Sequence, residues 1–118
     1  GLKPIGYLRS WAVAGVEPTL MGIGPVPASR KALERAGLTL DAMDVIEFNE
    51  AFAAQALAVC KALDVDPARV NRRGGAIALG HPLAASGTRL VLTALDQVSL
   101  CIGGGQGIAA VLEAADGV

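Results

Sequence analysis

The sequence contains few of the residues on which metal centres and disulfide frameworks depend. Its 118 residues include one histidine, His81, and two cysteines, Cys60 and Cys101. One histidine and two separated cysteines do not make a metal-ligand set, and two cysteines do not make a disulfide framework. We therefore expect no metal and no disulfide, and reduced thiols in a cytoplasmic protein.

An excess of charge and a long hydrophobic run are also missing. Ten lysines and arginines against eleven acidic residues leave a net charge of −1, which provides no general attraction to nucleic acid. The adjacent Arg72 and Arg73 are interpreted as a solvated turn. Gly, Asn or Arg interrupts every apolar run well short of the roughly 20 residues that span a bilayer. We expect neither a nucleic-acid nor a membrane partner.

The N-terminus, "GLKPIGYLRS", has neither an initiator methionine nor the pattern of a secretory leader. The length is sufficient for one domain. We expect this domain to belong to a longer polypeptide.

Alternating strand-like and helix-like segments predict an α/β domain with a layered, mixed sheet. Glycine after a helical segment and proline near its start mark the ends of one helix. The predicted strands are 5–15, 44–48, 98–102 and 107–114, and the predicted helices run from Pro27 to Gly37, after Asn49, and from about Ser86. No helix-ending residue separates Leu95 from Cys101. Either the helix ends early, or residues between Gln97 and Val98 are missing from the sequence, and we expect the second.

The segment after Asn49, "EAFAAQALAVCKALD", is apolar around most of its circumference. Such a helix is packed on several sides, so we predict that it is buried inside the domain. Asn49 itself has two interpretations: it caps this helix, or its amide points into a cavity and holds a water or a substrate oxygen. Glu50 is interpreted as a first-turn acid that the helix dipole favours.

The two cysteines have different surroundings. Cys60 shares a helix stripe with Leu57 and Leu63 and is interpreted as core. Cys101 ends an apolar strand and leads into "IGGGQG", where glycines let a ligand approach the backbone, so it is either a buried structural cysteine or a reactive one. "GGGQG" does not fit a dinucleotide-binding loop, because a strand rather than a helix follows it.

His81 lies between Gly80 and Pro82 in "GGAIALGHPLAASGTR". One interpretation is a core or turn histidine bonded to a backbone carbonyl. The other is a catalytic base, because an imidazole, a cysteine in a glycine loop and an asparagine amide are the groups that thiol-dependent acyl chemistry requires. Composition does not show whether the three converge.

Four blocks, "GIGPVPASRKALERAGL", "NEAFAAQALA", "NRRGGAIALGHPLAASGTR" and "CIGGGQG", occur in this order. In these blocks the chain resembles the C-terminal domain of thiolases, which make or cleave β-ketoacyl-CoA, and the resemblance covers residues 1–118. One departure is Ala84, where the family usually has glycine.

The resemblance implies a role for each of five residues. Asn49 would hold a catalytic water, and His81 would activate a nucleophilic cysteine and stabilise the enolate oxygen. Cys101 would take and return the substrate α-proton. The backbone N–H of Gly103 would belong to the oxyanion hole, and Phe52 would line the pantetheine tunnel.

The resemblance also implies partners. Acyl-CoA and CoA would be substrates, with no other cofactor, and the nucleophilic cysteine would lie in an N-terminal thiolase domain outside this sequence. A homodimer or homotetramer in fatty acid metabolism, such as β-oxidation, is expected, whereas direction and acyl length stay open. The alternative is a non-catalytic thiolase-like protein that binds acyl-CoA or lipid, or only pairs with other subunits. A ketoacyl synthase is disfavoured, because such enzymes use a second histidine at the place of Cys101.

Overall fold

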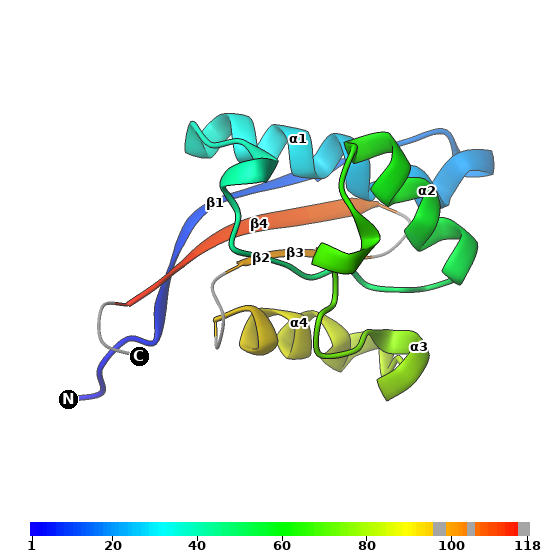
Figure 1. The fold of residues 1–118 in the computed structure, drawn as a ribbon. Helices are drawn as coiled ribbons and strands as arrows, with labels where there is room; N and C mark the ends of the chain where they lie inside the picture. The colour runs from blue at the N-terminus through cyan, green and yellow to red at the C-terminus, as the bar shows by residue number, and fades with distance from the viewer. Residues whose placement is uncertain (96–98, 104–105, 116–118) are drawn as a thin grey trace.

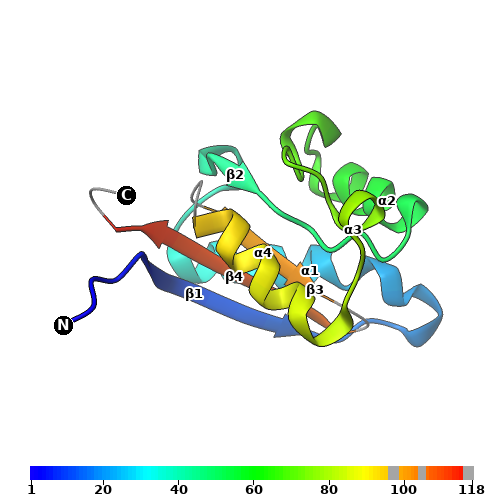
Figure 2. The same ribbon diagram turned by 90° about the horizontal axis from the view of Figure 1, so that it is seen from below.

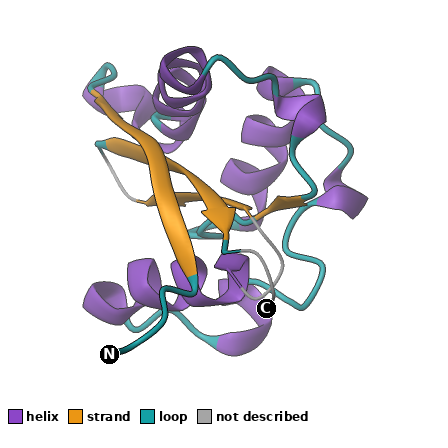
Figure 3. Cartoon of the chain, turned by 90° about the vertical axis from the view of Figure 1, so that its left-hand side faces the viewer, coloured by secondary structure: helices purple, strands orange, loops and turns teal. Residues whose placement is uncertain are grey.

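The computed structural model describes residues 1–95, 99–103 and 106–115, with the backbone alone for 99–103. Helices cover both faces of one sheet: α1 (Pro25–Ala36) and α2 (Ala53–Leu63) lie on one side, and α4 (Ser86–Leu95) lies on the other. The short α3 (Ala76–Leu79) precedes α4. Figure 3 shows the helices above and below the strands. The layered arrangement predicted from the sequence is confirmed.

The sheet is mixed, as expected. Its strand order is β1-β4-β3-β2. The strands are β1 (Gly6–Ala14), β2 (Val45–Ile46), β3 (Ser99–Gly103) and β4 (Gly107–Ala114). β4 pairs antiparallel with β1 and β3, whereas β2 pairs parallel with β3.

The side of the sheet that faces α1 holds the main core. Ala12 of β1, Ala28 and Ala32 of α1, and Ala109 of β4 are all fully buried. Because these side chains are small, α1 lies close to the strands at this position. α1 begins at Pro25, two residues before the predicted Pro27, and it ends at Gly37 as predicted.

Helix α2 differs from the prediction. Of its residues only Val59 and Cys60 are buried, and Leu57 is exposed. α2 is therefore a surface helix of this chain and not a buried one. The difference has a physical reason: an apolar helix surface indicates that the helix can be packed on several sides, but not that this chain supplies the residues that cover it.

The face that carries α4 is only partly covered. Figure 2 shows β1 beside α4 rather than beneath it. Trp11 is 56% exposed there, in an apolar groove of about 500 Å³ lined chiefly by Tyr7, Leu8, Trp11, Val91, Leu95 and Ile108. We refer to these six residues as the apolar groove. In the described part of the chain, no helix has both the length and the apolar character needed to cross a membrane.

The remaining predictions concern element boundaries. The helix from Ser86 and the strands ending at 102 and 114 agree with the structure to within one residue. The strand predicted at 44–48 pairs only at Val45 and Ile46, and an irregular segment follows. The predicted gap between Gln97 and Val98 lies outside the described residues.

Candidate active site

Asn49 and His81, which lie 32 residues apart in the sequence, are in contact. Asn49 Nδ2 lies 3.3 Å from His81 Nε2. Asn49 follows β2 by three residues and is buried, whereas His81 follows α3 and is exposed in this chain. Figure 1 shows α2 and α3, the helices next to the segments that carry this pair, at the end of the molecule opposite to both termini.

His81 has a second polar contact, with the first residue of α4. Its Nδ1 lies 2.6 Å from Ser86 Oγ, and Ser86 is buried. An amide Nδ2 only donates, so Nε2 accepts from Asn49, and Nδ1 then carries the ring hydrogen and donates a hydrogen bond to Ser86 Oγ. Both ring nitrogens are thus bonded, and the imidazole plane is fixed from two sides.

The backbone before His81 turns sharply. Gly80 has φ 95° and closes α3, and its N–H donates to the Ala76 carbonyl. A residue with a Cβ is strained at such a φ, which explains the glycine. This turn directs the chain from α3 into the His81 position.

Asn49 does not cap α2, which corrects one of its two interpretations. The residue at the N-cap is Phe52, and it makes no side-chain capping bond. Three residues separate Asn49 from the helix, so its amide is free to reach His81. Asn49 Oδ1 is buried and has no hydrogen-bond partner among the described residues.

Glu50 is not a first-turn acid either. Its Oε1 accepts from Asn71 Nδ2 at 2.7 Å, and its Oε2 accepts from the Ile77 N–H at 3.0 Å. The helix dipole of α2 therefore does not explain this carboxylate. It instead ties the Asn49 segment to the loop that leads to His81.

Asn71, Glu50 and Ser86 are the polar residues around this pair that the sequence did not identify as site residues. Asn71 has φ 50°, which asparagine tolerates better than most residues. Its place before "RRGG" indicates a turn, but nothing in the sequence indicates a contact with Glu50, 21 residues away. Ser86 could have been noticed as a hydroxyl at the start of a helix close behind the only histidine.

Cys101 and Gly103 are placed by their backbones in β3. β2 and β3 run parallel, with Ile46 opposite Leu100. Asn49 lies three residues beyond Ile46, and Gly103 lies three residues beyond Leu100. Both segments therefore run toward the same end of the sheet, where the strands β2 and β3 finish. The topology thus brings the segments of Asn49, Cys101 and Gly103 to one side of the domain.

Phe52 and Cys60 differ in exposure. Phe52, on the segment that carries Asn49, is 64% exposed and lies where a ligand can reach it. Cys60 is buried in α2, as predicted, and burial raises the pKa of its thiol. A thiolate is the nucleophilic form of cysteine, and a raised pKa makes that form scarce. Cys60 is therefore a core residue that is unsuited to attack a thioester.

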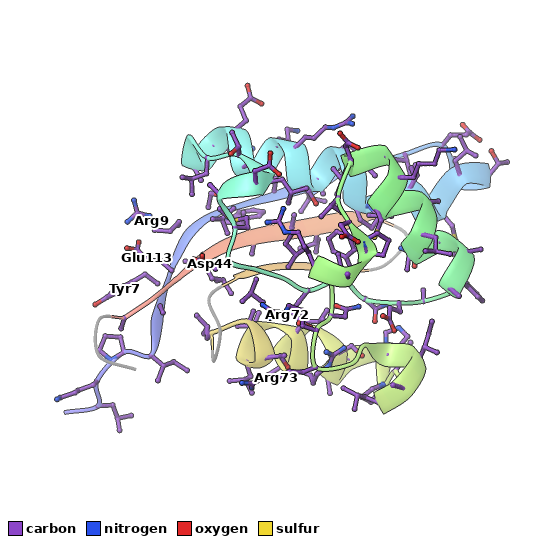
Figure 4. The ribbon with its side chains drawn as sticks, viewed as in Figure 1. Tyr7, Arg9, Asp44, Arg72, Arg73 and Glu113 are labelled. Atoms are coloured by element: carbon purple, nitrogen blue, oxygen red, sulfur yellow. The ribbon has the colours of Figure 1, made fainter. Side chains whose placement is uncertain are left out.

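A buried acid lies next to the site. Glu47 is 1% exposed, and its Oε2 is 3.6 Å from Arg89 Nη1. Burial raises the pKa of Glu47, while the charges of Arg89 and Arg73 oppose this rise. Arg72 and Arg73 are exposed in a turn, as predicted, and Figure 4 shows them on the α4 side of the sheet.

Residues 2–114 match the family model described as the C-terminal domain of thiolase. The chain belongs to the thiolase family.

Individual relatives agree with this assignment. The chain is 56% identical to a protein named beta-ketothiolase BktB from Cupriavidus necator and 55% identical to an acetyl-CoA acetyltransferase from Escherichia coli. Each match covers 96% of this chain and 31% of the relative. The chain thus spans about a third of the length of these relatives.

Two solved structures have the same fold. Human mitochondrial 3-ketoacyl-CoA thiolase superposes with a TM-score of 0.89 at 45% identity, over 96% of this chain and 31% of that one. The Acat5 thiolase from Ascaris suum, solved in complex with coenzyme A, gives 0.89 at 42% identity, over 97% and 32%. The fold of this chain is therefore that of a thiolase C-terminal domain.

Proposed function

We propose that this domain provides part of the active site of a thiolase, which transfers acyl groups between CoA thioesters and forms or cleaves the carbon–carbon bond of a β-ketoacyl-CoA. The Asn49–His81 contact, held from behind by Ser86, is the observation that carries the proposal. The nucleophilic cysteine belongs to an N-terminal thiolase domain. We use "complete polypeptide" for this chain joined to that domain.

In the first half of the reaction, the nucleophilic thiol replaces the Asn49 amide as the donor to His81 Nε2, and Nε2 takes its proton. The thiolate attacks the thioester carbonyl, and the Gly103 N–H stabilises the oxyanion that forms. CoA leaves as a thiolate and receives the proton of the Cys101 thiol, which leaves an acyl-enzyme, a Cys101 thiolate and a proton on His81 Nε2. The contact with Ser86 supports this role, because it keeps Nε2 as the proton-accepting nitrogen.

In the second half, Cys101 acts as the base. Its thiolate removes the α-proton of a second acyl-CoA, and His81 together with a water held by Asn49 stabilises the enolate oxygen. The resulting carbanion attacks the acyl-enzyme carbonyl, and the nucleophilic cysteine leaves as a thiolate that takes the proton back from His81 Nε2. The buried Asn49 Oδ1, which has no partner among the described residues, supports a polar ligand at this position. Phe52 lines the passage for the pantetheine arm.

Family membership supports this function over a non-catalytic acyl-CoA- or lipid-binding role. Relatives bear the names acetyl-CoA acetyltransferase and 3-ketoacyl-CoA thiolase, and the Ascaris suum structure contains coenzyme A. We also propose that the complete polypeptide acts in the cytoplasm as a homodimer or homotetramer, without a cofactor other than its CoA substrates, in fatty acid metabolism.

The test compares the complete polypeptide with its His81→Ala variant. We expect a loss of about 10³-fold or more in kcat for thiolysis, because the variant lacks the proton acceptor, with an unchanged circular dichroism spectrum. Mass spectrometry after incubation with acetyl-CoA should find an acetyl group on a cysteine outside this chain.

The matched control is Thr88→Ala, which truncates an exposed side chain on α4 two residues after Ser86 and should leave kcat unchanged. Near-normal turnover by His81→Ala would contradict the role of the imidazole. Binding of acetyl-CoA without turnover or acyl-enzyme in the unmodified protein would instead support the non-catalytic alternative.

A further inference from the structure

Glu50 is adjacent to the Asn49–His81 pair in the sequence, and the hydrogen bonds that its carboxylate makes among the described residues are to Asn71 and Ile77. It joins two segments that are far apart in the sequence, since its two oxygens accept from Asn71 Nδ2 and from the Ile77 N–H. Glu50 directly follows Asn49. Ile77 lies in α3, four residues before His81.

Asn71 extends this connection into a closed ring of hydrogen bonds. Its Oδ1 accepts from the Phe48 N–H at 2.8 Å, and its own N–H donates to the Ile46 carbonyl at 2.9 Å. Because Oδ1 is bound to Phe48, the Nδ2 group is directed at Glu50. The ring therefore holds the segment 48–50 against the segment 71–77, and Asn71, at its centre, is buried.

Gly75 shows that the local backbone leaves room for this carboxylate. A Cβ built on Gly75 would overlap the Glu50 carboxyl atoms. Its φ of −102° is open to any residue, so the requirement for glycine here is steric. The backbone of α3 thus lies close against the Glu50 side chain.

We propose that Glu50 is a positioning residue that sets the separation of Asn49 and His81. The proposal rests on the proposed function and extends it to a group that does not touch substrate. Glu50 fixes the Asn49 segment at one end and α3, and through Gly80 the imidazole, at the other. A displacement of about 1 Å at reacting groups costs on the order of 10²-fold in rate.

The test is an exchange of charge within the ring, made in the complete polypeptide. In Glu50→Gln, one side-chain oxygen and one NH₂ group face two donors, so the NH₂ group opposes a donor from Asn71 or Ile77. In Glu50→Gln with Asn71→Asp, the new NH₂ group donates to Asp, whose other oxygen still accepts from Phe48. Every hydrogen bond of the ring is then restored with the same net charge.

We expect Glu50→Gln and Asn71→Asp each to lower kcat by about 10- to 100-fold while the KM for acetyl-CoA changes by less than about threefold. The double variant should recover to within about fivefold of the unmodified kcat. The Asn49 side-chain amide resonance should shift in Glu50→Gln and return in the double variant. Glu34→Gln, an exposed acid on α1, is the control.

Rates are expressed per folded molecule, so a purely structural role predicts an unchanged kcat in every folded variant and would overturn the proposal. If Glu50→Gln does not fold, the double variant decides: a low kcat in its folded form overturns the proposal, and recovery supports it. Activity lost in His81→Ala but retained in Glu50→Gln would refute the positioning role alone. Equal activity of His81→Ala and the unmodified protein would refute the proposed function instead. An Asn49 amide resonance that does not shift in Glu50→Gln would refute the positioning role by a separate measurement.

Discussion

At the scale of single residues, the structure separates side chains that react from those that hold others. His81 and Asn49 touch each other, while Ser86, Glu50 and Asn71 bond to one member of the pair or to its backbone surroundings. Cys60 belongs to neither group, because its burial raises the pKa of the thiol and disfavours the reactive thiolate. A catalytic group and its support thus differ in what they contact, although both are polar.

Glu47 gives a prediction about pH. Burial raises the pKa of this carboxyl above its ordinary 4.5, so the folded chain holds the proton more tightly than the unfolded chain. Its contribution to stability is therefore present below pH 4.5 and is lost as the pH rises through the raised pKa. Arg89→Met removes a charge that lowers the Glu47 pKa, so this loss should extend to higher pH.

The measurement is the titration of the Glu47 carboxyl carbon by NMR, with urea unfolding across the same pH range. Arg9→Met serves as the matched control, because Arg9 pairs with the exposed Glu113 at 2.8 Å, and Figure 4 labels this pair on the neighbouring strands β1 and β4. A titration midpoint of Glu47 that stays constant or falls in Arg89→Met would show that Arg89 does not act on this carboxyl.

At the scale of elements, two glycines set where α1 and β4 lie. Gly37 ends α1 at φ 67° with open space around it, whereas a Cβ on Gly107 would overlap the Gly24 carbonyl just before α1. We expect Gly37→Ala to cost about 1–2 kcal/mol, for the left-handed backbone alone. Gly107→Ala should cost more, because β4 and the start of α1 must separate.

Thermal melting of the complete polypeptide compares the two glycine variants. Gly15→Ala, where nothing lies within 4 Å, is the control and should melt like the unmodified protein. A smaller decrease in Tm for Gly107→Ala than for Gly37→Ala would mean that the approach of β4 to Gly24 is less restrictive than the structure indicates.

The elements also show which parts of the fold can be predicted from the sequence. The predicted bounds of the strands β1, β3 and β4 and of the helices α1 and α4 agree with the structure to within two or three residues, because their hydrophobic period and their Gly and Pro boundaries are local properties. The predicted burial of α2 is wrong, since composition does not tell an alanine that is covered from one that is not. The approach of Asn49 to His81 depends on two segments that are far apart in the sequence coming together in the fold. The contacts of Glu50 depend on the same long-range packing. The family blocks indicate the first approach but not the second.

At the scale of the whole molecule, the apolar groove beside α4 is an exposed apolar surface of the chain. Trp11, 56% exposed there, is the only tryptophan of the chain. The 118-residue chain expressed alone should bind the dye ANS, because it presents a contiguous apolar surface to water. Trp11→Lys combined with Ile108→Lys should greatly reduce the dye fluorescence, which a titration with ANS measures.

Leu38→Lys removes an exposed apolar residue, 42% accessible, outside the groove and is the control. If the double variant bound as much dye as the unmodified chain, the groove would not be the surface that ANS detects.

The register shift in β1 has a consequence for the tendency of this chain to aggregate. β1 is an edge strand, and the pairing with β4 shifts between Leu8 and Ser10, so that Arg9 is an extra residue. A bulge twists an edge and interrupts its row of backbone donors and acceptors, and an arginine there places a charge where a foreign strand would dock. While the apolar groove is exposed to water, the irregular edge of the sheet at β1 should hinder fibril growth by the addition of strands from other chains.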